Sequence, residues 1–137
     1  MDSNFSLKDK IFIAGSNGMV GSAIYRNLIK KGYGKSNVGG QILCPKREEL
    51  NLLNSQEVKE WFSKNKPDIV IVAAAKVGGI LANNTFPADF LLENLKIQVN
   101  VIENSHLFGA KRLLFLGSSC IYPKFSSQPI KEDYLLN

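Results

Sequence analysis

Apolar and polar positions follow one another along the chain in blocks that predict strands and helices in turn. Short apolar runs rich in β-branched residues are typical of strands buried on both faces, whereas apolar residues three or four positions apart indicate the inner stripe of a helix. This alternation predicts an α/β fold, a parallel sheet of about four strands with helices on both faces. The expected strands are 10–14, 41–44, 69–75 and 113–116, and the expected helices are 19–31, 56–65 and 89–108.

The first expected strand leads into a glycine-rich turn and then a helix. The stretch from Lys10 to Ala23 reads KIFIAGSNGMVGSA, with Gly15, Gly18 and Gly21 at three-residue spacing. In such a unit the backbone N–H groups and the positive end of the helix dipole approach a pyrophosphate, provided that glycines leave room. Because a strand and a helix flank the glycines, dinucleotide binding is favoured over a plain connecting turn.

Composition describes a globular chain of the size of one domain. The chain has 137 residues, of which 45% are hydrophobic and 21% are charged, and its net charge is +5. These values are typical of a folded protein rather than a disordered one. The scattered lysines and arginines are interpreted as a solvated surface rather than a nucleic-acid site, and their positive field also suits an anionic cofactor and substrate.

The cysteines and the N-terminus indicate the cellular compartment. Cys44 and Cys120 lie far apart and form no C-x-x-C motif, so neither a disulfide framework nor a metal site is expected. The opening stretch MDSNFSLKDK has no apolar signal region, and no apolar run is long enough to span a bilayer. We therefore expect a cytoplasmic protein without a membrane partner.

Basic residues follow the second expected strand, at a place that matters for cofactor choice. In a doubly wound sheet of the Rossmann type, ligands bind beyond the carboxyl ends of the strands, and an acidic residue near this point usually holds the ribose of NAD. Here Lys46 and Arg47 come first, which favours the 2′-phosphate of NADP. Two alternatives stay open, since these residues can form a solvated turn and the nearby Glu48 can serve NAD.

Small and hydroxyl-bearing residues follow the third and fourth expected strands. The run 73–76 reads AAAK, and its small side chains would let a ring or ribose lie against the backbone, although close packing explains them nearly as well. The run 117–120 reads GSSC. Ser118 either donates to a substrate oxygen or bonds its own backbone. Cys120 is either a proton-transfer group or an inert thiol.

Four stretches together resemble the GDP-L-fucose synthases: IFIAGSNGMVGSAI, REELNLLN, AAAKVGGILANNTFPADF and LLFLGSSCIYPK. That family belongs to the extended short-chain dehydrogenase/reductase superfamily, and its members are NADP-dependent epimerase/reductases of GDP-4-keto-6-deoxymannose. The resemblance runs over nearly the whole chain and implies a Rossmann-like sheet, an NADP(H) cofactor and a GDP-sugar substrate. Asn17 departs from it, because the family often has a basic residue there.

The resemblance also implies roles for single residues. Ser118 would be the catalytic serine and Cys120 the base of the epimerisation. Arg47 would meet the 2′-phosphate, the glycine turn would bind the pyrophosphate, and the stretch after the fourth strand would approach the nicotinamide. The expected cofactor-binding residues are Gly15, Ser16, Asn17, Gly18, Met19, Val20, Gly21, Arg47, Glu48, Glu49, Leu50, Asn51, Leu52, Ala73, Ala74, Ala75, Lys76, Leu116, Gly117 and Ser119.

The family's Tyr-x-x-x-Lys pair, which serves proton transfer, does not occur in the 137 residues. A strand order of 3-2-1-4 would also leave the apolar strand 113–116 at an edge, a liability for association. We therefore expect an incomplete N-terminal part of an NAD(P)-binding domain, without a C-terminal substrate domain and inactive alone. It would be homodimeric or completed by a missing C-terminal half. A non-catalytic dinucleotide-binding module, and half of an NAD-dependent nucleotide-sugar epimerase or dehydratase, are the alternatives.

Overall fold

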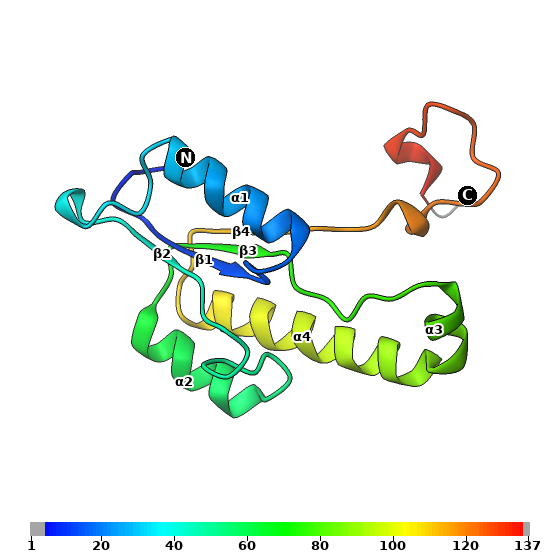
Figure 1. Cartoon of the computed structure of the whole chain (residues 1–137), viewed down its shortest axis with the longest axis horizontal. Coiled ribbons are helices and arrows are strands. Elements are labelled where there is room, and N and C mark those ends of the chain that lie inside the picture. Colours follow the sequence, from blue (N-terminus) through cyan, green and yellow to red (C-terminus); the bar gives the residue numbers. More distant parts are fainter. Residues whose placement is uncertain (1–4, 136–137) are drawn as a thin grey trace.

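A computed structural model describes residues 5–135 and shows a parallel sheet between two layers of helices (Figure 1). Within these residues the sheet has four strands in the order β2-β1-β3-β4, and every neighbouring pair is parallel. The strands are β1 (Lys10–Ala14), β2 (Gln41–Leu43), β3 (Ile69–Val72) and β4 (Arg112–Phe115). The α-helices are α1 (Met19–Lys30), α2 (Ser55–Asn65), α3 (Ile80–Thr85) and α4 (Pro87–Leu107).

The two helix layers follow from the handedness of the connections. The chain steps from β1 to β2 in one direction across the sheet, and from β2 to β3 and on to β4 in the other. Because parallel crossovers are right-handed, α1 must lie on one face and α2 and α4 on the opposite face. Figure 1 shows this arrangement, which confirms the expected α/β fold with helices on both faces.

Alternation along the strands divides the core into two clusters. Successive strand side chains point to opposite faces. Phe12 and Val70 therefore pack with Phe62 of α2 and Val101 of α4, all of them buried. On the other face, Ile11, Ile13, Ile69 and Ile71 form a second buried cluster that the side chains of Ile24 and Leu28 of α1 cover.

The expected strand order of 3-2-1-4 is wrong. β3 lies beside β1, on the side away from β2, and β4 pairs with β3. The burial of the strands explains the order, because all four residues of β3 are buried whereas the three residues of β2 are partly or fully exposed. A strand buried on both faces gains most from a central position, and a short, half-exposed strand suits an edge. The expected edge position of the last strand is confirmed, and all four β4 residues are exposed.

Most expected boundaries agree with the structure within two residues, with two exceptions. β3 ends at Val72 instead of Ala75, because after Ala73 donates to the carbonyl of Ala14 at 2.9 Å the chain leaves the sheet. The short helix α3 is not among the expected helices, since asparagine and threonine favour turns. Here the Asn83 side chain donates to the carbonyl of the N-cap residue Gly79, and the Thr85 hydroxyl donates to the Leu81 carbonyl within the helix.

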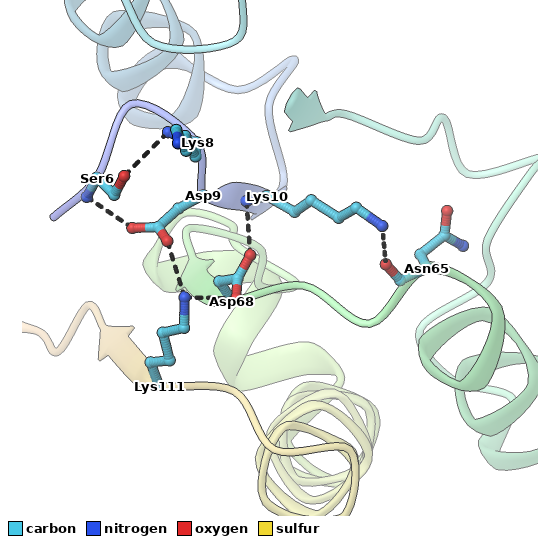
Figure 2. Close-up of polar contacts among 7 residues, drawn as sticks. All are labelled: Ser6, Lys8, Asp9, Lys10, Asn65, Asp68 and Lys111. Atoms are coloured by element: carbon cyan, nitrogen blue, oxygen red, sulfur yellow. Dashed lines mark hydrogen bonds and ion pairs between the residues drawn. The ribbon is translucent and has the colours of Figure 1, made fainter. Parts of the chain in front are cut away.

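A cluster of ion pairs joins the amino ends of three strands (Figure 2). The Lys111 ammonium, beside β4, lies 3.0 Å from a carboxylate oxygen of Asp9 and 2.8 Å from one of Asp68. Asp68 also accepts from the Lys10 amide at 2.9 Å, and Asp9 is 4% exposed. The hydrogen bonds to Asp68 and Asp9 raise the pKa of Lys111. Burial alone would raise the pKa of Asp68, but the bonds from Lys10 and Lys111 outweigh it and lower the pKa.

Replacing Lys111 with methionine is expected to lower the free energy of unfolding by about 1 kcal/mol at pH 7, since the lysine is largely solvated and its pairs are screened. Because the folded-state pKa of Asp68 is lowered, its contribution is present above the unfolded value of 3.8 and is lost as pH falls through the folded value. Urea unfolding of both proteins should therefore differ at pH 7 and converge in acid. Lys59→Met removes a charge outside the cluster, and an equal loss in that variant would contradict the prediction.

Candidate functional site

The glycine turn between β1 and α1 is packed against the segment that follows β3. Gly15 has φ +82°, and a methyl group on it would lie 2.6 Å from the Ala73 carbonyl oxygen. Gly21 is buried, and a methyl group there would lie 2.1 Å from the Gly15 carbonyl oxygen. Gly18 donates to Gly15 at 3.0 Å and closes the turn. The turn thus has this shape only because neither Gly15 nor Gly21 carries a side chain.

The amino end of α1 lacks the groups that usually satisfy a helix start. Gly18 at the N-cap provides no side-chain bond, and the first turn holds no acidic residue. In α2, by contrast, the Asn54 side chain accepts from the amides of Gln56 and Glu57, and Glu57 adds a negative charge. First-turn amides have no partner within a helix, and they favour negative charge. The start of α1 is therefore suited to a phosphate, while the start of α2 is already satisfied.

The other expected residues of the glycine turn differ in their exposure to solvent, because only Ser16 among them is buried. Asn17, Met19 and Val20 are exposed, with Met19 at 87%. Ser16 is buried, and its side chain lies beside Cys44, just past β2. Burial raises the pKa of Cys44, and the Ser16 side chain offsets only part of that effect.

The turn after β2 presents Arg47 to solvent. The Glu49 carboxylate accepts from the Lys46 amide at 2.7 Å, and the Glu49 amide donates back to the Lys46 carbonyl at 3.0 Å. Glu49 is therefore used to shape the turn, and Arg47 and Glu48 stand exposed on it. Among residues 5–135 the guanidinium of Arg47 has no hydrogen-bond or ion-pair partner, so it is available to an anion.

The expected adenine-side residues after this turn lie further inside. Leu50 is 4% exposed and belongs to the cluster around Phe12, so its side chain is core. The Asn51 side chain accepts from the Leu53 amide at 3.1 Å. The Leu52 carbonyl accepts from the Asn100 side chain of α4 at 2.8 Å. These contacts fix the path of the segment.

The segment after β3 is held by α4. Ala73 and Ala74 are half-buried, with Ala74 against the core, and Ala75 is exposed. The backbone of Lys76 makes two hydrogen bonds with the Asn94 side chain, and its ammonium pairs with Glu93. Glu93 and Asn94 were not expected from the sequence. A polar pair within an apolar helical stripe was the available signal, but the partner lies far away in the chain.

After β4 the chain runs out beyond the sheet edge (Figure 1). Leu116 still donates to the Val72 carbonyl at 3.3 Å, and Gly117 is exposed. The Ser118 hydroxyl oxygen accepts from the amide of Cys120 at 3.1 Å, at the short 3-10 turn Ser119–Ile121. This is the local backbone bond that was one of two alternatives for Ser118, and the hydroxyl proton remains able to donate elsewhere. Cys120 is an exposed free thiol.

The segments that carry the expected site residues therefore lie side by side along the carboxyl edge of the sheet. Going across from β2 to β4, the chain presents the Arg47 turn, the glycine turn, the segment 73–76 and the segment 116–120. Neighbouring strands are about 4.8 Å apart, so these four groups span roughly 14 Å. Direct contacts join the glycine turn to Ala73 and Leu116 to Val72. An elongated ligand with an anionic centre fits this edge.

Nearly the whole sequence that forms this site matches one protein family. Residues 11–137 match the NAD dependent epimerase/dehydratase family. The chain belongs to this family. The match includes every strand end described above.

Individual members of the family are similar over nearly all of this chain. GDP-L-fucose synthase 1 of Arabidopsis thaliana is 54% identical over 127 residues, which are 93% of this chain and 38% of that protein. GDP-L-fucose synthase of Escherichia coli is 50% identical over 129 residues, 94% of this chain and 38% of that protein. A solved structure, MlghC, a GDP-mannoheptose C4 reductase from Campylobacter jejuni with NADP bound, has 40% identity and a TM-score of 0.87, covering 97% of this chain and 40% of that one. The chain thus spans 38% of the length of these two curated relatives.

None of the helices between residues 5 and 135 has the length and apolar character needed to cross a membrane. In the same part of the chain, no three His, Cys, Asp or Glu side chains gather where they could hold a metal ion.

Proposed function

We propose that this chain is the cofactor-binding part of an NADP-dependent GDP-sugar epimerase/reductase of the GDP-L-fucose synthase type. The observation that carries the proposal is the pairing of an uncapped helix start at a glycine cradle with an unpartnered Arg47 at the next strand end. A pyrophosphate and a 2′-phosphate are the anions that these two features suit. The NADP-bound reductase with 40% identity supports the same reading.

The residues present fit the cofactor group by group. The amides at the start of α1 would hold the pyrophosphate, and the Arg47 fork would hold the 2′-phosphate by two parallel hydrogen bonds. The segment 73–75 offers small side chains against which a ribose can lie. When bound, the reduced nicotinamide supplies the hydride for the reduction of a ketone. Leu116 and the 3-10 turn that follows would face that half of the cofactor.

Ser118 and Cys120, which follow β4, would act on the substrate. For this substrate we propose GDP-4-keto-6-deoxymannose. The Cys120 thiolate would remove the proton from the carbon beside the ketone, and reprotonation from the other face would invert that carbon. The Ser118 hydroxyl would donate to the ketone oxygen as negative charge develops on it during reduction. The bond from the Cys120 amide to Ser118 keeps both groups in one turn, which supports their joint action.

Replacing Arg47 with alanine is expected to raise the Kd for NADPH by about thirtyfold, the effect of losing a charge-assisted pair with a phosphate. The Kd for NADH should change by less than about twofold, because NADH lacks the 2′-phosphate. Isothermal titration of the 137-residue chain measures both values. Binding is a more suitable measurement than turnover, since the Tyr-x-x-x-Lys pair that serves proton transfer in the GDP-L-fucose synthases does not occur in these residues.

Arg26→Ala is the matched control, because Arg26 is an exposed arginine of α1 with no described partner. It should leave both affinities unchanged. A wild-type chain that binds NADH as tightly as NADPH would contradict the role of Arg47. That outcome would favour an NAD-dependent nucleotide-sugar epimerase or dehydratase, with the exposed Glu48 next to Arg47 holding the ribose hydroxyls.

A further inference from the structure

The segment after β3 is fixed to α4 by an unusual side-chain clamp. The Asn94 carbonyl oxygen accepts from the Lys76 amide at 2.7 Å, and the Asn94 NH₂ group donates to the Lys76 carbonyl at 3.0 Å. One side-chain amide therefore satisfies both backbone groups of one residue, as a neighbouring strand would. Lys76 lies past the end of β3, so it has no strand partner there. The Asn94 side chain takes the place of a strand partner for Lys76.

Other residues on the same face of α4 hold the segment as well. Glu93 pairs with the Lys76 ammonium, which also lies 5.4 Å from the centre of the Phe90 ring. Gly78 is packed so closely on Phe90 that a methyl group on it would lie 2.8 Å from the ring. Residues three and four apart share a helix face, so Phe90, Glu93 and Asn94 act together. The charge of Lys76 is thus directed at α4.

The other end of the segment is fixed by the glycine turn. The Ala73 amide donates to the Ala14 carbonyl at 2.9 Å, and Gly15 lies directly against the Ala73 carbonyl. Ala74 and Ala75 are therefore held between two anchors, one on β1 and one on α4. A segment with both ends fixed presents its backbone in one conformation, which lowers the ordering cost of binding a ligand there.

The position of the segment within the sheet says which part of a ligand it meets. It lies between the glycine turn on β1 and the segment after β4. Under the proposed function, the adenosine half with its 2′-phosphate lies on the β2 and β1 side, and the nicotinamide half lies on the β3 and β4 side. NADPH must cross the clamped segment, whereas 2′,5′-ADP ends at the glycine turn.

We infer that Asn94, with Glu93 beside it, is a positioning residue that holds segment 73–76 in the shape needed by the nicotinamide half of the cofactor. This inference rests on the proposed function. Asn94 lies on α4 and acts through the backbone of Lys76. Lys76 in turn contributes its peptide path to the site, while its ammonium group is used by Glu93 and Phe90.

Asn94→Ala is expected to raise the Kd for NADPH by about tenfold, the cost of two lost hydrogen bonds at a preorganised segment. The Kd for 2′,5′-ADP should stay within about twofold, because that ligand does not reach the segment. Hydrogen exchange of the Lys76 amide in the free protein should become faster by about tenfold or more. Asn94→Asp keeps the acceptor for the Lys76 amide but loses the donor, so it should fall between Asn94→Ala and wild type in all three measurements.

Gln98→Ala is the matched control, since Gln98 lies one turn further along α4 and its side chain has no partner among residues 5–135. It should change none of the three values. Equal weakening of NADPH and 2′,5′-ADP by Asn94→Ala would indicate general damage to the fold and overturn the inference, as would unchanged NADPH binding. A wild-type chain that binds neither ligand would contradict the proposed function instead, and Lys76 exchange would then decide the clamp by itself.

Discussion

Replacing Gly21 with alanine should lower the free energy of unfolding by about 3 kcal/mol, the upper range for overpacking, and remove NADPH binding as well. The added methyl group would lie 2.1 Å from the Gly15 carbonyl oxygen and 2.9 Å from the Ser16 Cα. Both are backbone atoms, so no rotamer change relieves the overlap. Relief requires α1 to move away from the turn, which opens the cluster beneath it. Urea unfolding followed by circular dichroism measures the loss.

Two other glycine-to-alanine changes separate packing from binding. At Gly18 the closest contact of an added methyl group is 3.3 Å, so the free energy of unfolding should fall by less than about 1 kcal/mol. The methyl group would lie where the phosphates approach, so it should weaken the binding of NADPH. At Gly79 the added group meets nothing within 4 Å, so neither stability nor NADPH affinity should fall. A Gly21→Ala protein as stable as Gly79→Ala would contradict the close approach of α1 to the turn.

The parts of the fold that sequence predicted well are those set by neighbouring residues. β1 and the start of α1 lie where the apolar run and the glycines placed them, because the strand, turn and helix signals are all local. The cap of α2 also depends on local sequence alone, since Asn54 needs only the amides two and three residues ahead. Local hydrogen-bonding chemistry is sufficient to place such elements.

The strand order was not predictable in the same way. Whether β3 follows β2 outward or crosses back beside β1 depends on which strand is buried most, and that is a competition among residues far apart in sequence. The apolar run 69–75 did signal a buried strand, but the alanines within it misplaced the strand end. Ala73–Ala75 carry too little apolar surface to require a place in the sheet.

The candidate site also has a part that neighbouring residues determine and a part that distant residues determine. Residues directly after strands were predictable, because the carboxyl ends of parallel strands meet at one edge. The clamp of Lys76 by Asn94 was not, because the two residues are 18 positions apart and their contact depends on how α4 lies across the sheet. Side-chain bonds to distant backbone leave no periodic trace in a sequence.

Phe62→Ala is expected to cost about 4 kcal/mol of unfolding free energy, because a large, fully buried ring is replaced by a cavity. Phe62 is 0% exposed, and its ring centre lies 5.6 Å from that of Phe12 on β1 and 5.5 Å from that of Trp61. The three rings pack edge to face or tilted, and they support the layer in which α2 lies against α4. The loss should appear as a lower urea midpoint with an unchanged slope.

Phe125→Ala provides the comparison, because this ring is 90% exposed and its removal should change stability by less than about 0.5 kcal/mol. The pair also tests how the site depends on the core. α4 carries both Val101, which packs beside Phe62, and Asn94, which clamps Lys76. A cavity at Phe62 should therefore quicken exchange of the Lys76 amide along with the core amides. If Phe62→Ala destabilised the core while Lys76 exchange stayed unchanged, α4 would not transmit core packing to the site.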